Sequence, residues 1–148
     1  MKKYVKFGLL ILWMALIFFF SSQVSDDSTV TTNIVINILY KIYCAFVSPP
    51  KDILTFTEIV FKPVRKIAHF SEFAILGLLA YINIKDFKTN KAILYSALLC
   101  LIYSISDEIH QIFVPGRACT LIDVLIDFCG SIVGILFIHL VLKRWKKD

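Results

Sequence analysis

Four long apolar runs divide the chain, and shorter polar stretches separate them. The runs cover about residues 4–20, 66–84, 92–106 and 121–142. Three of them are close to the ~20 residues that an α-helix needs to cross the hydrocarbon core of a bilayer, and the run over residues 92–106 is somewhat shorter. The pattern therefore predicts an all-α membrane protein, an integral bundle of four transmembrane helices.

The first run follows a basic start, Lys2-Lys3, as the hydrophobic part of a secretory signal peptide does. Its apolar part is bulky and no A-x-A cleavage site follows it, although Ser21, Ser22 and Ser25 leave cleavage open. We expect a membrane helix that is retained in the mature protein.

Residues 29–61, between the first two runs, are less apolar and more regularly patterned. Pro49-Pro50 should end a first helix, and Pro63 should limit a short second helix over about residues 52–61. An apolar stripe opposite a polar face is typical of a helix that lies in the membrane interface. We therefore expect one or two interfacial amphipathic helices here. Apolar residues recur at every fourth position: Val30, Ile34, Ile38, Ile42 and Phe46.

The composition agrees with this class of protein. Hydrophobic residues make up 58% of the 148 residues, and the mean hydropathy is +0.77, whereas soluble domains contain about 45–50% apolar residues. The net charge of +5 does not indicate nucleic-acid binding, because the bases flank apolar runs and form no patch interleaved with stacking aromatics. We expect a single domain, residues 1–148, whose principal partner is the lipid bilayer.

The charged residues predict how the chain is oriented in the membrane. With a cytoplasmic N-terminus, four spans place ten of the sixteen basic and two of the eleven acidic residues inside. Six basic and nine acidic residues then lie outside. The positive-inside rule therefore predicts a multi-pass protein of the cell membrane with both termini in the cytoplasm, with residues 29–61 on the extracytoplasmic face.

Ionisable residues cluster at the outer ends of the last three spans. Such residues are costly to desolvate next to lipid, which makes them functional candidates. Helical spacing places Arg65, His69 and Glu72 on one face, and Asp107, His110 and Gln111 on another. We predict a single polar site on the extracytoplasmic face. The predicted binding residues are Arg65, Lys66, His69, Glu72, Asp107, Glu108, Gln111, Arg117, Asp123 and Asp127.

The last span carries two aspartates in line with two glycines. Asp123 and Asp127 are i, i+4 neighbours, and their stripe continues into Gly130 and Gly134. A Gly-xxx-Gly pair lets helices approach closely, so we expect this stripe to face the bundle interior. An alternative role for Asp123 is that of N-cap of this helix.

The predicted site contains five carboxylates and three cations. Ion pairing, protonation of a carboxyl group or a bound cation would each relieve the repulsion between the carboxylates. The spacing matches no established metal motif, and the four cysteines form no Cys-x-x-Cys pair, so no metal site is predicted. A divalent ion held by two carboxylates and His110 stays open as a cofactor.

Three segments together resemble the VanZ-like membrane protein family. They are Arg65-Lys66-x-Ala68-His69-Phe70-x-Glu72, Ser106-Asp107-Glu108-x-His110-Gln111 with Pro115-Gly116-Arg117, and Asp123-Val124-x-x-Asp127-x-x-Gly130. The resemblance implies a small multi-span protein of the Gram-positive cell membrane. It also implies a connection with antibiotic resistance, because the family's founding member is associated with reduced susceptibility to teicoplanin.

Three functions are compatible with the predicted site. A non-enzymatic factor would bind a lipid or cell-wall precursor head group, with Arg65, Lys66 and Arg117 available for phosphate. A purely structural charge network would only hold the helices together. A membrane enzyme would act on a lipid-linked phosphate or ester; its candidate catalytic residues are Glu108, Asp127, His69 and His110.

Overall fold

The computed structural model describes residues 3–23, 29–47, 52–87, 91–115, 117 and 119–145, and the secondary structure in this part of the chain is entirely helical. Four helices are long and apolar enough to cross a membrane, which confirms the predicted all-α, multi-span fold. They are α1 (Lys3–Ser21), α3 (Ile53–Lys85), α4 (Ala92–Gln111) and α5 (Leu121–Arg144). The remaining helix is α2 (Thr29–Phe46).

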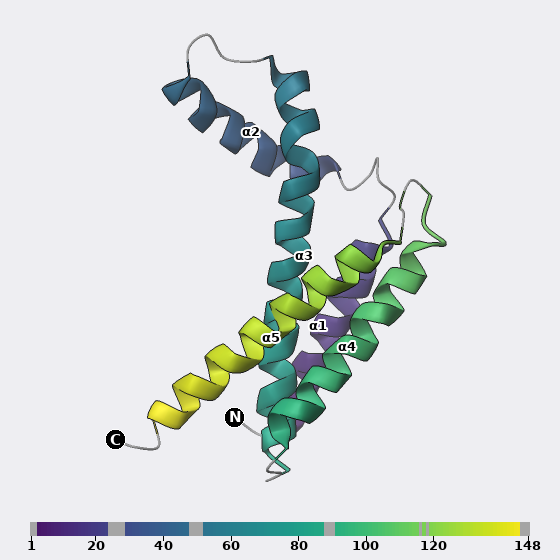
Figure 1. The fold of residues 1–148 in the computed structure, drawn as a ribbon, viewed down its shortest axis with the longest axis vertical. Coiled ribbons are helices and arrows are strands. Elements are labelled where there is room, and N and C mark those ends of the chain that lie inside the picture. The colour runs from purple at the N-terminus through teal and green to yellow at the C-terminus, as the bar shows by residue number, and fades with distance from the viewer. Residues whose placement is uncertain are drawn as a thin grey trace.

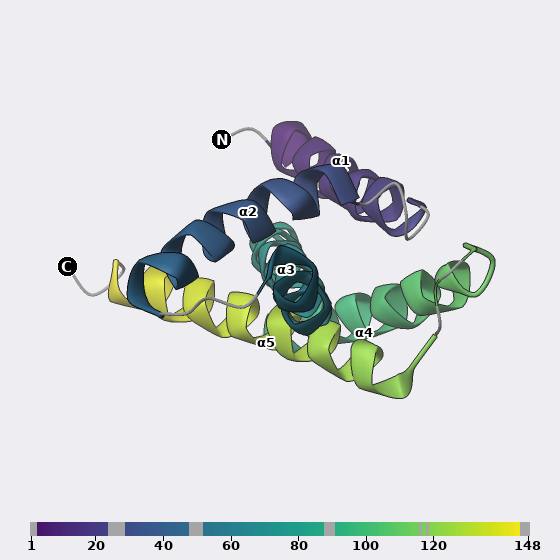
Figure 2. The same ribbon diagram turned by 90° about the horizontal axis from the view of Figure 1, so that it is seen from above.

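The four long helices form a bundle around the C-terminal half of α3 (Figure 1). Both marked chain ends lie at one end of this bundle, and α2 lies beyond the opposite end. Seen from above, α2 runs across the bundle while α3 is viewed nearly end-on (Figure 2). The structure thus separates the termini from the α4–α5 connection. Which of these two ends faces the cytoplasm remains a prediction from the charge distribution.

Helix α3 differs from the prediction because it is one continuous helix of 33 residues with Pro63 inside it. We expected a short helix that stopped before Pro63 and a separate span from residue 66. Proline cannot donate to the carbonyl of Ile59, four residues earlier. Ile59 and Pro63 are both exposed, so solvent can satisfy that carbonyl, and the helix continues. At 1.5 Å per residue, α3 is about 50 Å long, so its N-terminal part projects beyond a hydrocarbon core of about 30 Å.

Helix α4 also continues further than predicted. The apolar run was expected to end near Ser106, yet the helix extends to Gln111 and includes Asp107 and Glu108. Both carboxylates are buried, with exposed fractions of 3% and 2%. Their polar character does not end the helix because partners on α1 and in the α4–α5 connection accommodate them.

Within the described residues, the amphipathic segment forms one separate helix, α2, and its predicted apolar stripe faces outward. Among the helices it contacts only α3, where Tyr40 and Tyr43 pack on Phe56 and Ile36 is buried. Such an outward apolar stripe is compatible with a place in the membrane interface. Its exposed residues include Ile34, Val35, Ile38, Leu39, Ile42 and Phe46.

The bundle core consists of large apolar side chains from all four long helices. Phe73 and Leu76 of α3, Cys100 of α4 and Ile135 of α5 have no exposed surface. Side chains donate hydrogen bonds to backbone carbonyls of other helices: the Trp13 indole to Glu72 (2.9 Å) and the Tyr103 hydroxyl to Met14 (2.6 Å). These bonds fix α1 against α3 and α4.

Helices α3 and α5 touch backbone to backbone through three glycines. A Cβ atom on Gly77 would overlap the carbonyl of Ser131, and one on Gly130 would overlap the carbonyl of Phe70. A Cβ atom on Gly134 would overlap the carbonyl of Ala74. The predicted inward-facing glycine stripe of α5 is confirmed, and this contact sets the distance between the two helices.

We predict that Gly134→Leu destabilises the bundle strongly, by several kcal/mol, because the new side chain must push α5 away from α3. Gly8→Leu is the matched control, because nothing lies within 4 Å of a Cβ at Gly8. Thermal unfolding of both variants in detergent tests this. Equal melting temperatures for the two variants would contradict the proposed close contact.

Candidate functional site

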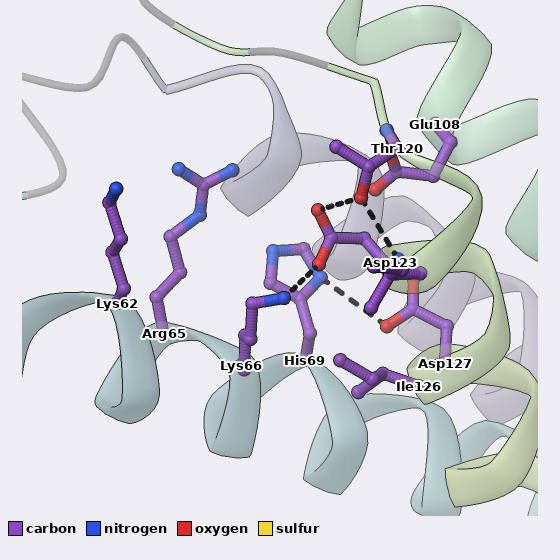
Figure 3. A pocket seen from close by; sticks show the side chains of 10 residues that line it. Lys62, Arg65, Lys66, His69, Glu108, Thr120, Asp123, Ile126 and Asp127 are labelled. Carbon is purple, nitrogen blue, oxygen red and sulfur yellow. Dashed lines mark hydrogen bonds and ion pairs between the residues drawn. The ribbon is translucent and has the colours of Figure 1, made fainter.

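A pocket of about 370 Å³ lies where α3, α4 and the start of α5 meet (Figure 3). It is at the end of the bundle opposite the chain termini. Six of the predicted binding residues line it. The full lining is Lys62, Arg65, Lys66, His69, Glu108, Thr120, Ile122, Asp123, Ile126 and Asp127.

Helix α3 provides a basic wall. Lys62, Arg65, Lys66 and His69 are spaced i, i+3, i+4 and i+7, so one helix face carries all four into the pocket. Of the two lysines and the arginine in this wall, only Lys66 has a carboxylate ion pair among the described residues, with its ammonium 2.9 Å from the Asp123 carboxylate. The cationic groups of Lys62 and Arg65 therefore retain donors for a ligand.

The start of α5 forms the opposite wall, and hydrogen bonds between its N-cap and its third residue hold it in place. The N-cap is Thr120, whose hydroxyl oxygen accepts the Asp123 N–H (3.2 Å). The same hydroxyl donates to the Asp123 carboxylate (2.7 Å). The sequence had allowed Asp123 to be the N-cap, but it is the third residue of the helix. A carboxylate at this position complements the helix dipole.

Glu108 connects α4 to the N-cap of α5. Its carboxylate accepts the backbone N–H of Thr120 at 3.2 Å. A buried carboxylate that accepts a backbone donor holds the connection between the helices in a defined position. Glu108 is thus both a lining residue and a support for the start of α5.

Three side chains from three helices converge at the base of the pocket. His69 Nδ1 is 3.9 Å from Asp127 Oδ1, too far for a hydrogen bond. One potential ligand atom from each of His69, Asp107 and Asp127 lies within 4.8 Å of the others. Of the described residues, this trio is the arrangement able to hold a metal ion.

A hydrogen-bonded chain behind the pocket links Asp107 to α1 and α3. Asp107 Oδ2 accepts from the Ser21 hydroxyl (2.7 Å) and from Gln111 Nε2 (3.0 Å). Gln111 Oε1 in turn accepts from the Arg65 guanidinium at 3.2 Å. Asp107 and Gln111 therefore lie next to the pocket and position its residues without lining it.

Three further predicted residues do not line the pocket. His110 faces α1, where its ring stacks on Phe18 (4.2 Å between centroids) and its Nε2 lies 3.0 Å from the Ser22 hydroxyl. Glu72 is half-buried on α3, and the described residues show no Arg65–Glu72 ion pair. The third residue is Arg117.

Arg117 caps the C-terminal end of α1. Its guanidinium donates to the carbonyl of Phe20 (3.1 Å) and to that of Gln23 (3.0 Å). A cation that satisfies the last carbonyls of a helix is favourable there. Burial, with the nearby charge of Arg65, lowers the pKa of Arg117 from its ordinary value, but an arginine side chain stays charged.

Sequence reasoning missed several residues of the site. Thr120 had a readable signal, because Thr120 and Asp123 are spaced as a capping box before an apolar run. Lys62 lies one helical turn before Lys66, but the expected helix end at Pro63 hid this. Ser21 gave no signal, since only the folded bundle brings it to Asp107.

The fold and site define a multi-pass α-helical membrane protein with a polar pocket at one end of its helix bundle. The chain belongs to the VanZ/LLP1 family, whose family model matches residues 7–142. This match confirms the resemblance that the three polar segments indicated. Neither a curated protein nor a solved structure matches the chain significantly.

We predict that Arg117→Ala speeds hydrogen–deuterium exchange at the end of α1, near residues 20–23, because two carbonyls lose their charged donor. Arg117→Lys should restore part of the protection, since an ammonium can still donate to one carbonyl. Exchange monitored by mass spectrometry tests this. Unchanged exchange in Arg117→Ala would contradict the capping role.

Proposed function

We propose that the pocket binds the phosphate-bearing head group of a membrane lipid or of a lipid-linked cell-wall precursor. The observation that carries this proposal is the basic wall, in which Lys62 and Arg65 face the pocket without a carboxylate ion pair among the described residues. Arginine matches phosphate geometry with two parallel hydrogen bonds, and lysine adds a compact charge.

The place of the pocket suits an amphiphilic ligand. Ile122 and Ile126 line its apolar side, and Leu121, Ile122 and Leu125 of α5 are more than half exposed. A lipid could place its head group on the basic wall and its chain along this part of α5. A pocket of about 370 Å³ lies within the range of ~300–1,000 Å³ typical of small-molecule sites.

The charge distribution supports the extracytoplasmic leaflet as the source of the ligand. The start of α5, which lines the pocket, lies at the bundle end opposite both marked termini, and the positive-inside rule predicts that these termini are cytoplasmic. We also propose that residues 1–148 form a single domain, because residues of α3, α4 and α5 together line the pocket.

We predict that Arg65→Ala and Lys62→Ala each weaken binding of a polyprenyl phosphate by about ten- to a hundredfold, because a hydrogen bond to a charged group contributes about 1.5–3 kcal/mol. Lys143→Ala, which removes an exposed cation at the opposite end of the bundle, is the matched control. Titration of each purified variant in detergent measures the affinities. Equal affinity in all three variants would contradict the basic wall as the binding element.

The family resemblance extends this proposal to lipoglycopeptide antibiotics. We propose that occupancy of the pocket alters the cell surface so that teicoplanin, which carries a lipid tail, is less effective. Vancomycin lacks such a tail and serves as the comparison. In this proposal the polar residues of the pocket are needed for protection.

We predict that the wild-type chain, expressed in a sensitive Gram-positive host, raises the inhibitory concentration of teicoplanin more than that of vancomycin. Glu108→Gln and Asp127→Asn should reduce this effect at matched membrane levels, because each replaces a carboxyl group that lines the pocket. Susceptibility assays measure the outcome. Full protection by both variants would separate resistance from the pocket, and no protection by the wild type would refute the resistance role.

A further inference from the structure

We propose that His69, Asp107 and Asp127 form a binding site for a divalent transition-metal ion at the base of the pocket. The cluster brings together one nitrogen and two carboxylate donors from α3, α4 and α5, with the potential ligand atoms within 4.8 Å of one another. The sequence had left a cation open with His110 as the nitrogen ligand, but His110 faces α1. This inference does not depend on head-group binding.

The strongest support is the state of the Asp127 carboxylate. Asp127 is only 1% exposed, and both its carboxylate oxygens are buried without a hydrogen-bond partner within the described part of the chain. Burial of a carboxylate without a partner is very costly in free energy. A bound cation would offset that cost.

Asp107 has one oxygen held and one oxygen available. Its Oδ2 accepts hydrogen bonds from Ser21 and Gln111, whereas its buried Oδ1 has no hydrogen-bond partner among the described residues. Outer groups that hold one oxygen of a ligating carboxylate are typical of metal sites, because they orient the other oxygen.

His69 supplies the third potential ligand atom of the cluster, its Nδ1. Its Nδ1 is likewise buried and without a hydrogen-bond partner in the described chain, 3.9 Å from Asp127 Oδ1. Two atoms that each lie about 2.0–2.2 Å from a shared zinc ion can be separated by this distance. If one of the two side chains were only protonated, His69 and Asp127 would still be too far apart for a hydrogen bond between them.

The donor set indicates the class of ion. One imidazole nitrogen and two carboxylates suit Zn²⁺ or Mn²⁺ better than Mg²⁺ or Ca²⁺, which favour oxygen ligands alone. Three protein ligands leave a further coordination position. His69 and Asp127 both line the pocket, so an ion can enter from there.

The test is metal binding by the purified full-length protein in detergent, after removal of metal with a chelator. We expect about one equivalent of Zn²⁺ or Mn²⁺ per chain, retained through gel filtration and quantified by elemental analysis, with much weaker binding of Mg²⁺. Asp127→Asn should weaken binding by more than about 100-fold, since even outer-shell changes typically cost 10–100-fold. Glu58→Gln removes an exposed carboxylate of α3 outside the cluster and is the matched control.

A second measurement covers variants that fail to fold. Mn²⁺ bound to the wild-type protein should show coupling to one imidazole nitrogen in electron paramagnetic resonance, and His69→Gln should lose that coupling. Absence of stoichiometric binding of Zn²⁺ or Mn²⁺ by the wild type would overturn the inference. Equal binding by Asp127→Asn and Glu58→Gln, or Mn²⁺ binding without nitrogen coupling, would overturn it too.

Discussion

The backbone contact between α3 and α5 is the constraint on which the rest of the structure depends. Gly130 lies against the carbonyl of Phe70, and Gly134 lies against that of Ala74. His69 directly precedes Phe70, and Asp127 is one helical turn before Gly130. The glycines therefore bring these two side chains together at the base of the pocket. Any side chain at Gly130 would push α3 and α5 apart, whereas the site requires these two helices to lie close together.

The second constraint is the cost of burying charge at the end of a membrane bundle. Asp107, Glu108 and Asp127 are all at most 3% exposed. Asp107 is stabilised by Ser21 and Gln111, and Glu108 by the Thr120 backbone. Asp127 alone of these three has no such partner among the described residues. If the charged residues served only to hold the helices together, Asp127 should have a partner as Asp107 and Glu108 do. Its lack of a partner favours a ligand-binding site.

The sequence predicted the architecture well because long apolar runs have few alternatives to membrane helices. The spacing of Gly130 and Gly134 also predicted correctly which face of α5 lies inside the bundle. The prediction of helix ends at Pro63 and near Asp107 was wrong. A helix continues past a proline when solvent binds the unpaired carbonyl, and past a buried carboxylate when other groups donate hydrogen bonds to it. Local signals for helix ends are weak compared with tertiary contacts of this kind.

The sequence grouped the polar residues into one candidate site, but it did not predict which of them line the pocket and which pack against α1. Helical spacing shows which residues share a face, not which neighbouring helix that face meets. Arg65 and His69 thus line the pocket, whereas Arg117 and His110 turn toward α1. Only the folded arrangement separates residues that can contact a ligand from those that hold α1 in place.

The most direct test of this account is a competition on the wild-type protein between a polyprenyl phosphate and the same polyprenol without phosphate. Native mass spectrometry of the protein in detergent would count the bound molecules of each. If the basic wall recognises a phosphate-bearing head group, the phosphorylated lipid will be retained selectively. Equal retention of both lipids would contradict the account and reduce the pocket to a feature of the helix packing.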